Sequence, residues 1–197
     1  MKRIHGLALL LAAVVLAGFA PAVLAQGGTP GPASQLTASP SPNPVSDMLR
    51  QLLPRYTKNM VGAAESMPAD KYNYKPTPEQ NTFGHTVLHV AQSNFILCSK
   101  LTSTPPPTSD AKDTDPKDKL VGAIKASFDY CSEVLAKTTD TDLGTPISLS
   151  ATRSMSRAGI MITLACDWYD HYAAQAIYLR LNGILPPSAA APASPRQ

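Results

Sequence analysis

Apolar residues recur at three- and four-residue spacing in several separate stretches of this chain, and this periodicity constrains the fold more than any other feature. Such spacing places apolar side chains on one face of an α-helix, whereas a half-buried strand requires alternation. Alternation occurs only in a brief segment at residues 145–150, so no sheet is needed. Helices are expected at residues 45–67, 83–101 and 155–182. Another helix is expected to begin at residue 116, and the apolar residues on its buried face continue to residue 135.

Capping residues indicate where the second and third helices begin. Asn81 or Thr82 can cap the helix that starts at residue 83, because their side-chain oxygens accept from free backbone N–H groups. Thr114 or Asp115 can cap the third helix. Pro116 then occupies its first helical position, where the missing backbone donor costs nothing.

Proline and glycine mark the other ends. Pro54 interrupts the first apolar stripe, so we expect either a kink there or a short first segment. Asn182 and Gly183, followed by Pro186 and Pro187, end the fourth helix, with glycine in the left-handed conformation. Four helices with short or moderate connections predict an all-α fold, a four-helix bundle.

The first residues have the features of a secretory signal peptide. Lys2 and Arg3 form a basic start, residues 7–20 form an apolar run, and residues 23–25 supply small side chains for cleavage after Ala25. The run is shorter than the roughly 20 apolar residues that cross a bilayer. We therefore expect export to the periplasm or the extracellular space, with no membrane span after cleavage.

Composition predicts four regions in the chain. Residues 1–25 are the expected signal peptide, and residues 26–44, rich in Gly, Pro, Ser and Thr, are an expected disordered linker. Residues 45–187 form the expected bundle. Residues 188–197 have the linker's composition and form an expected disordered tail.

Removal of the signal also changes the charge. The chain has 17 basic and 14 acidic residues, and loss of Lys2 and Arg3 leaves 15 basic residues and a net charge of +1. Nucleic-acid binding usually needs a basic patch that neutralises phosphates. A nucleic-acid partner is therefore not expected.

Three phrases carry a resemblance to a known family. They lie at residues 68–78, at residues 82–91, and from His171 to residues 178–187. Together they resemble the DinB-like (YfiT-like) superfamily of four-helix bundles over about residues 45–187. The resemblance implies a divalent metal held by one histidine of the second helix and two histidines, four residues apart, of the last helix. It also implies thiol-dependent transferase or hydrolase activity in some members.

Transferred to this chain, the resemblance assigns His89 and His171 as two metal ligands. Asp167 stands where the family pattern has its third histidine. Asp167 and His171 are four residues apart and so share a helix face, about one turn from each other. Imidazole and carboxylate suit zinc or non-haem iron, so the candidate cofactor is a divalent ion: zinc, nickel, manganese or iron.

An alternative needs no metal. Asp167 and His171 would then form a hydrogen-bonded pair, and His89 would be a neutral, packed histidine. His85 shares a helix face with His89. It is either an additional ligand or a group that supports the ligands, or it is exposed in the first turn of the helix. Three aromatic side chains of the last helix are expected to pack in the core: Trp168, Tyr169 and Tyr172.

Export allows disulfide formation, and the chain has three cysteines. Cys98 and Cys131 are the favoured pair, because both lie towards apolar stripes of helices that can be bundle neighbours. Cys166 lies in an apolar stretch and is expected to be a buried, inert thiol. A pairing that involves Cys166, or a nucleophilic role for it, stays open.

Two classes of function follow. The first is a metal-dependent hydrolase or transferase that acts on an unidentified small molecule, with unassigned catalytic residues. The second is a non-catalytic bundle that binds a small ligand or a partner protein. A homodimer is compatible with either. A di-iron oxidase is not expected, because the Glu-x-x-His pairs of such bundles are missing.

Overall fold

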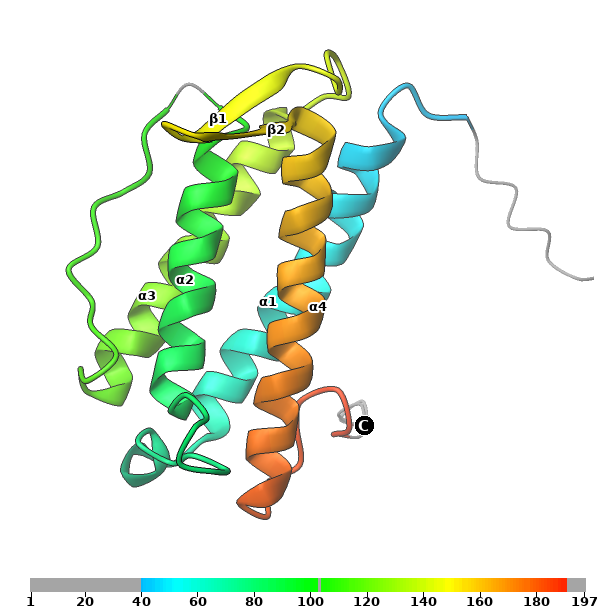
Figure 1. The fold of residues 1–197 in the computed structure, drawn as a ribbon. Coiled ribbons are helices and arrows are strands. Elements are labelled where there is room, and N and C mark those ends of the chain that lie inside the picture. Colours follow the sequence, from blue (N-terminus) through cyan, green and yellow to red (C-terminus); the bar gives the residue numbers. More distant parts are fainter. Residues whose placement is uncertain (1–39, 103, 191–197) are drawn as a thin grey trace, which may run out of the picture. The chain divides into compact units, whose positions relative to one another are not determined.

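The computed structural model describes residues 40–102 and 104–190, which form a four-helix bundle (Figure 1). The prediction of an all-α bundle is confirmed. The predicted signal peptide, most of the predicted linker and the end of the predicted tail fall in residues 1–39 and 191–197, outside the described residues. The helices are α1 (Pro44–Ser66), α2 (Phe83–Ser99), α3 (Lys117–Lys137) and α4 (Arg157–Leu181), with a short 3₁₀ turn, η1 (Ala69–Lys71).

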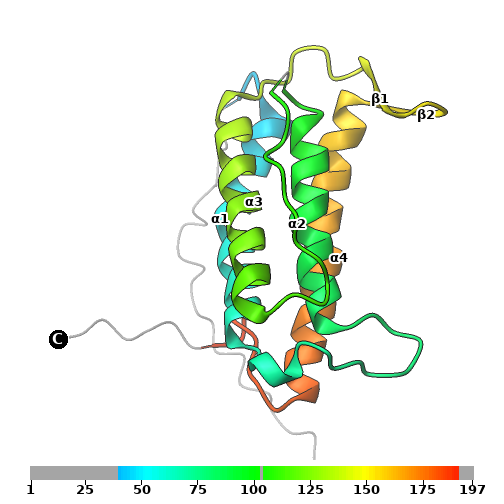
Figure 2. The ribbon, with the colours of Figure 1, turned by 90° about the vertical axis from the view of Figure 1, so that its left-hand side faces the viewer.

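The order of the helices around the bundle follows from their contacts. Both α1 and α2 pack against α3 and α4. The connection from α2 to α3 runs back along the whole bundle (Figures 1 and 2), so these two helices are parallel and α1 and α4 run the opposite way. Within the described residues, no helix is long and apolar enough to span a bilayer. The core includes these fully buried side chains: Trp168, Phe83, Phe128, Met60, Met67, Leu120, Ile124, Leu135, Ile160, Met161, Leu164 and Leu179.

Two predicted helix ends are confirmed and one is wrong. The Thr82 hydroxyl accepts from the His85 N–H at 3.0 Å, which caps α2. Gly183 adopts φ +73°, the left-handed conformation expected after α4. The third helix begins one residue later than predicted, with Pro116 at the cap position and no side-chain cap. The Asp115 carboxylate is already engaged, because it accepts from the Lys112 N–H at 2.8 Å.

Helix α1 is continuous through Pro54, so the predicted short first segment does not form. Its N-terminus is held by a residue from another part of the chain. The Asp140 carboxylate accepts from the N–H groups of Val45 at 2.7 Å and Ser46 at 2.9 Å. A negative charge at a helix N-terminus satisfies free donors and interacts favourably with the helix dipole.

A β-hairpin projects from one end of the bundle beside the start of α4 (Figures 1 and 2), so the prediction that no sheet is needed is wrong. Strand β1 (Pro146–Ser150) pairs antiparallel with β2 (Arg153–Ser156). Ile147 lies opposite Met155, and both side chains pack against the bundle core. The apolar side chains of the hairpin are thus partly buried against the bundle.

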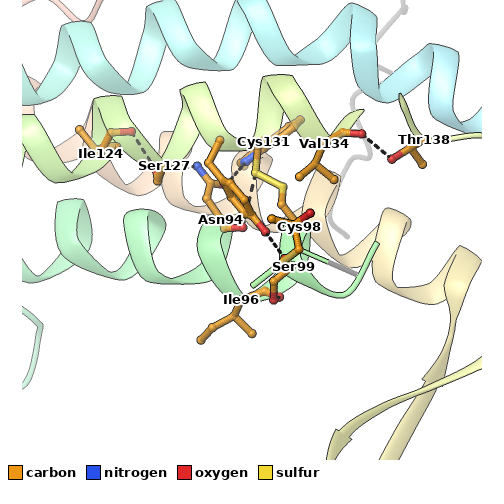
Figure 3. Close-up of a disulfide and its surroundings, with 12 residues drawn as sticks. Asn94, Ile96, Cys98, Ser99, Ile124, Ser127, Cys131, Val134 and Thr138 are labelled. Atoms are coloured by element: carbon orange, nitrogen blue, oxygen red, sulfur yellow. Dashed lines mark hydrogen bonds between the residues drawn. A yellow bond between two sulfur atoms is a disulfide. The ribbon is translucent and has the colours of Figure 1, made fainter. Parts of the chain in front are cut away.

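A disulfide joins Cys98 of α2 to Cys131 of α3, as predicted (Figure 3). Both cysteines lie late in parallel helices, so they reach the same end of the bundle, with 5.5 Å between their Cα atoms. The expectation of a buried Cys166 is wrong, because this free thiol is exposed. Position 166 follows exposed Ile162 by one turn and precedes exposed Asp170 by one turn, so it lies on the outer face of α4.

Candidate metal centre

The structure brings His89, Asp167 and His171 together between α2 and α4. Asp167 and His171 occupy successive turns of α4, and His89 lies on the facing side of α2. Each residue offers one ligand atom, and these atoms all lie within 4.8 Å of one another. His89 thus converges with two residues that are far from it in the sequence, as the metal hypothesis requires.

The donor set fits a divalent ion. Nε2 of His89 lies 3.6 Å from Oδ1 of Asp167, and two donor atoms on one tetrahedral zinc ion are about 3.4 Å apart. Nδ1 of His171 lies 2.9 Å from the backbone oxygen of Asp167. With Nδ1–H donating to that oxygen, the Nε2 atom of His171 is left for the ion, an arrangement common in metal-binding histidines.

The carboxylate of Asp167 is the most enclosed of the three groups. Its side chain is 13% exposed, and its Oδ2 atom is buried without a hydrogen-bond partner. Burial raises the pKa of Asp167, although the nearby His171 and His89 act in the opposite direction. A buried carboxylate oxygen without a partner is costly, and a bound cation would offset that cost.

A small pocket opens beside the three residues. It has a volume of about 200 Å³, below the roughly 300 Å³ at which sites for drug-sized ligands begin. Polar and apolar groups share its wall, so it suits a small ligand that forms hydrogen bonds. The lining residues are Gln80, Asn81, His85, Thr86, His89, Asp170, His171, Ala174 and Tyr178.

His85 lines this pocket but lies outside the group of three. Its ring centroid is 6.4 Å from that of His89, and its Nδ1 atom lies 3.4 Å from a carboxylate oxygen of Asp113. The ring of His89 is much closer to that of His171, at 4.4 Å. The structure therefore places His85 at the rim of the pocket.

The prediction that three aromatic residues of α4 pack in the core is confirmed for two of them. Trp168 is fully buried and Tyr172 is buried. Tyr169 is 51% exposed, so it is not a core residue, although its ring centroid lies 4.8 Å from that of Tyr56.

Cys166 lines an apolar surface groove with Met48 and Ile162, away from the three candidate ligands.

Sequence reasoning missed two neighbouring polar residues of α2. The hydroxyl of Ser93 lies 3.3 Å from Nε2 of His89. Asn94 is fully buried and accepts a hydrogen bond from Nε1 of Trp168 at 2.7 Å. The available signal was the position of Ser93, one turn after His89 on the same helix face.

The comparisons with known proteins agree on the fold. The DinB superfamily model matches residues 53–173, which include all three candidate ligands. A crystal structure of a DinB-like protein from Bacillus cereus ATCC 10987 is 17% identical, with a TM-score of 0.57, over 70% of this chain and 92% of that chain. A DinB-like protein from Bacillus subtilis is also 17% identical, with a TM-score of 0.54, over 68% of this chain and 92% of that one.

A conserved protein from Enterococcus faecalis is 16% identical, with a TM-score of 0.53, over 68% of this chain and 94% of that chain. At such identities the likeness to solved structures concerns the fold alone. No curated protein matches the sequence.

Proposed function

Because the chain belongs to the DinB superfamily and gathers His89, Asp167 and His171 beside a small pocket, we propose that it is a metal-dependent hydrolase or transferase. The observation that carries this proposal is the convergence of two imidazoles and one enclosed carboxylate. Two histidines and one carboxylate form an established ligand set for zinc and for non-haem iron.

The residues around the site suit this role. Three protein ligands leave coordination positions open, and the pocket lies beside them. When bound, a divalent ion supplies polarisation of a substrate oxygen or activation of water or a thiol. The pocket is small, and polar groups of His85 and Asn81 line it, which suits the binding of a small polar substrate or of a small polar part of one.

Metal content tests the proposal directly. The protein, purified without a histidine tag, is incubated with zinc, nickel, manganese or iron separately and analysed for bound metal. We expect about one ion per chain, and we expect His89→Ala and His171→Ala to lose it. His85→Ala is the matched control and should retain the ion, because His85 lies outside the ligand group.

The measured metal content decides between the two classes of function. Bound metal that depends on His89 and His171 justifies a screen of small ester, amide and thiol-transfer substrates, with His171→Ala as the inactive control. If none of the metals binds, the enzyme proposal fails. The alternative of a non-catalytic bundle would then stand, with the short contact between His171 and the backbone of Asp167 as a structural hydrogen bond.

We also propose that the protein is exported. The basic start, the apolar run and the small residues before Gln26 support cleavage of a signal peptide. The disulfide between Cys98 and Cys131 supports an oxidising compartment. Intact-mass analysis of protein recovered from outside the cytoplasm should show a chain that begins at Gln26. A full-length chain confined to the cytoplasm would contradict this proposal.

A further inference from the structure

The hydroxyl of Ser93 is oriented unlike several other helical hydroxyls of this bundle. A serine or threonine in a helix commonly bonds a carbonyl oxygen one turn earlier. Four residues of α2, α3 and their ends follow that pattern: Thr86, Ser99, Ser127 and Thr138. Ser93 instead turns its hydroxyl to the imidazole of His89, with 3.3 Å between Oγ and Nε2.

The same contact brings Ser93 near α4, because Nε2 of His89 lies 3.6 Å from Oδ1 of Asp167. Ser93 therefore contacts one candidate ligand, His89 of α2, at the atom that lies nearest to a second one, Asp167 of α4. Its side chain is partly buried, so the hydrogen bond is partly shielded from water.

We propose that Ser93 is a positioning residue of the metal centre, whose hydroxyl donates to the Asp167 carboxylate when Nε2 of His89 holds the ion. Coordination occupies the lone pair of Nε2, so the hydroxyl hydrogen is then free for the carboxylate. Carboxylate ligands are commonly oriented by such outer hydrogen bonds. This role rests on the metal-dependent function proposed above.

Cobalt(II) binding to the purified protein tests this role without any assay of activity. Affinity is measured by chelator competition, and the coordination environment is followed by the visible absorption spectrum. We expect Ser93→Ala to bind cobalt about 10- to 100-fold more weakly and to change the spectrum. Ser93→Thr restores a hydroxyl and should recover most of the affinity.

Ser99→Ala is the matched control, since Ser99 lies on the same helix but bonds the backbone oxygen of Ile96 at 2.8 Å. It should bind cobalt like the wild type. Alanine is a better helix former than serine, so Ser93→Ala should stay folded, which thermal unfolding verifies.

The possible results distinguish a failure of the proposed Ser93 role from a failure of the metal-dependent function on which it rests. Wild-type affinity and spectrum in Ser93→Ala would overturn the role of Ser93 and leave the metal centre intact. Tighter binding would also overturn it, because the hydroxyl would then be competing with the ion for Nε2 of His89. If the wild-type protein binds no cobalt, zinc, nickel, manganese or iron, the proposed function fails and the role of Ser93 fails with it.

Discussion

At the scale of single residues, Asn94 connects three helices through one buried amide. Its Nδ2 atom donates to the hydroxyl of Ser127 on α3 at 3.1 Å (Figure 3). Its Oδ1 atom accepts from Nε1 of Trp168 on α4 at 2.7 Å. Since Trp168 directly follows Asp167, this bond helps fix how α4 presents its carboxylate to α2.

Replacement of Asn94 by alanine should destabilise the protein by about 2–3 kcal/mol, because the buried indole N–H of Trp168 would lose its acceptor. Urea unfolding followed by circular dichroism measures the loss. Gln92→Ala is the matched control, since Gln92 is exposed on the same helix and its truncation should change stability by less than about 0.5 kcal/mol. An equally small effect at Asn94 would show that the amide bonds contribute little.

The sequence predicts some site residues and misses others for a physical reason. Asp167 and His171 are recognisable because four-residue spacing places them on one helix face, and the family resemblance adds His89. Ser93 and Asn94 give no comparable signal, because serine and asparagine also occur on helices without a specific partner. Their roles depend on the facing helix, which local sequence patterns do not identify.

At the scale of secondary-structure elements, the helices are predictable because their periodicity is local. The apolar stripe expected at residues 83–101 corresponds to α2, which begins at Phe83 and ends at Ser99. The hairpin is less predictable, since its strands span five and four residues. The alternation at residues 145–150 covers β1, but a run this short does not by itself indicate a sheet. Ile147 and Met155 become informative only when the core against which they pack is known.

Two glycines should respond to alanine substitution with opposite signs. Gly183 has φ +73° with open space around its Cβ position, so Gly183→Ala should cost about 1–2 kcal/mol through backbone strain alone. Gly122 lies inside α3, also with nothing near its Cβ position. Gly122→Ala should therefore stabilise the protein by about 0.5–1 kcal/mol. Thermal unfolding of both variants measures the two shifts, and shifts of the same sign would contradict this account.

At the scale of the whole molecule, the direction of the helices was not predictable. Apolar stripes identify which face of a helix is buried, but they do not say whether neighbouring helices are parallel. The long connection that returns along the bundle makes α2 and α3 parallel (Figure 2). That arrangement is what places Cys98 and Cys131 at one end of the bundle.

The disulfide should contribute much of the stability of the bundle. Its cysteines are separated by 33 residues, and closing a loop of that length in the unfolded chain stabilises the folded state by about 4 kcal/mol. Cys98→Ala combined with Cys131→Ala should lower the free energy of unfolding in urea by about that amount. Cys166→Ala is the control, because this thiol is exposed and unpaired, and its change should stay within about 0.5 kcal/mol. If the variant that lacks both Cys98 and Cys131 were as stable as the wild type, helix packing alone would hold α2 against α3. The disulfide would then not stabilise the exported chain that we propose.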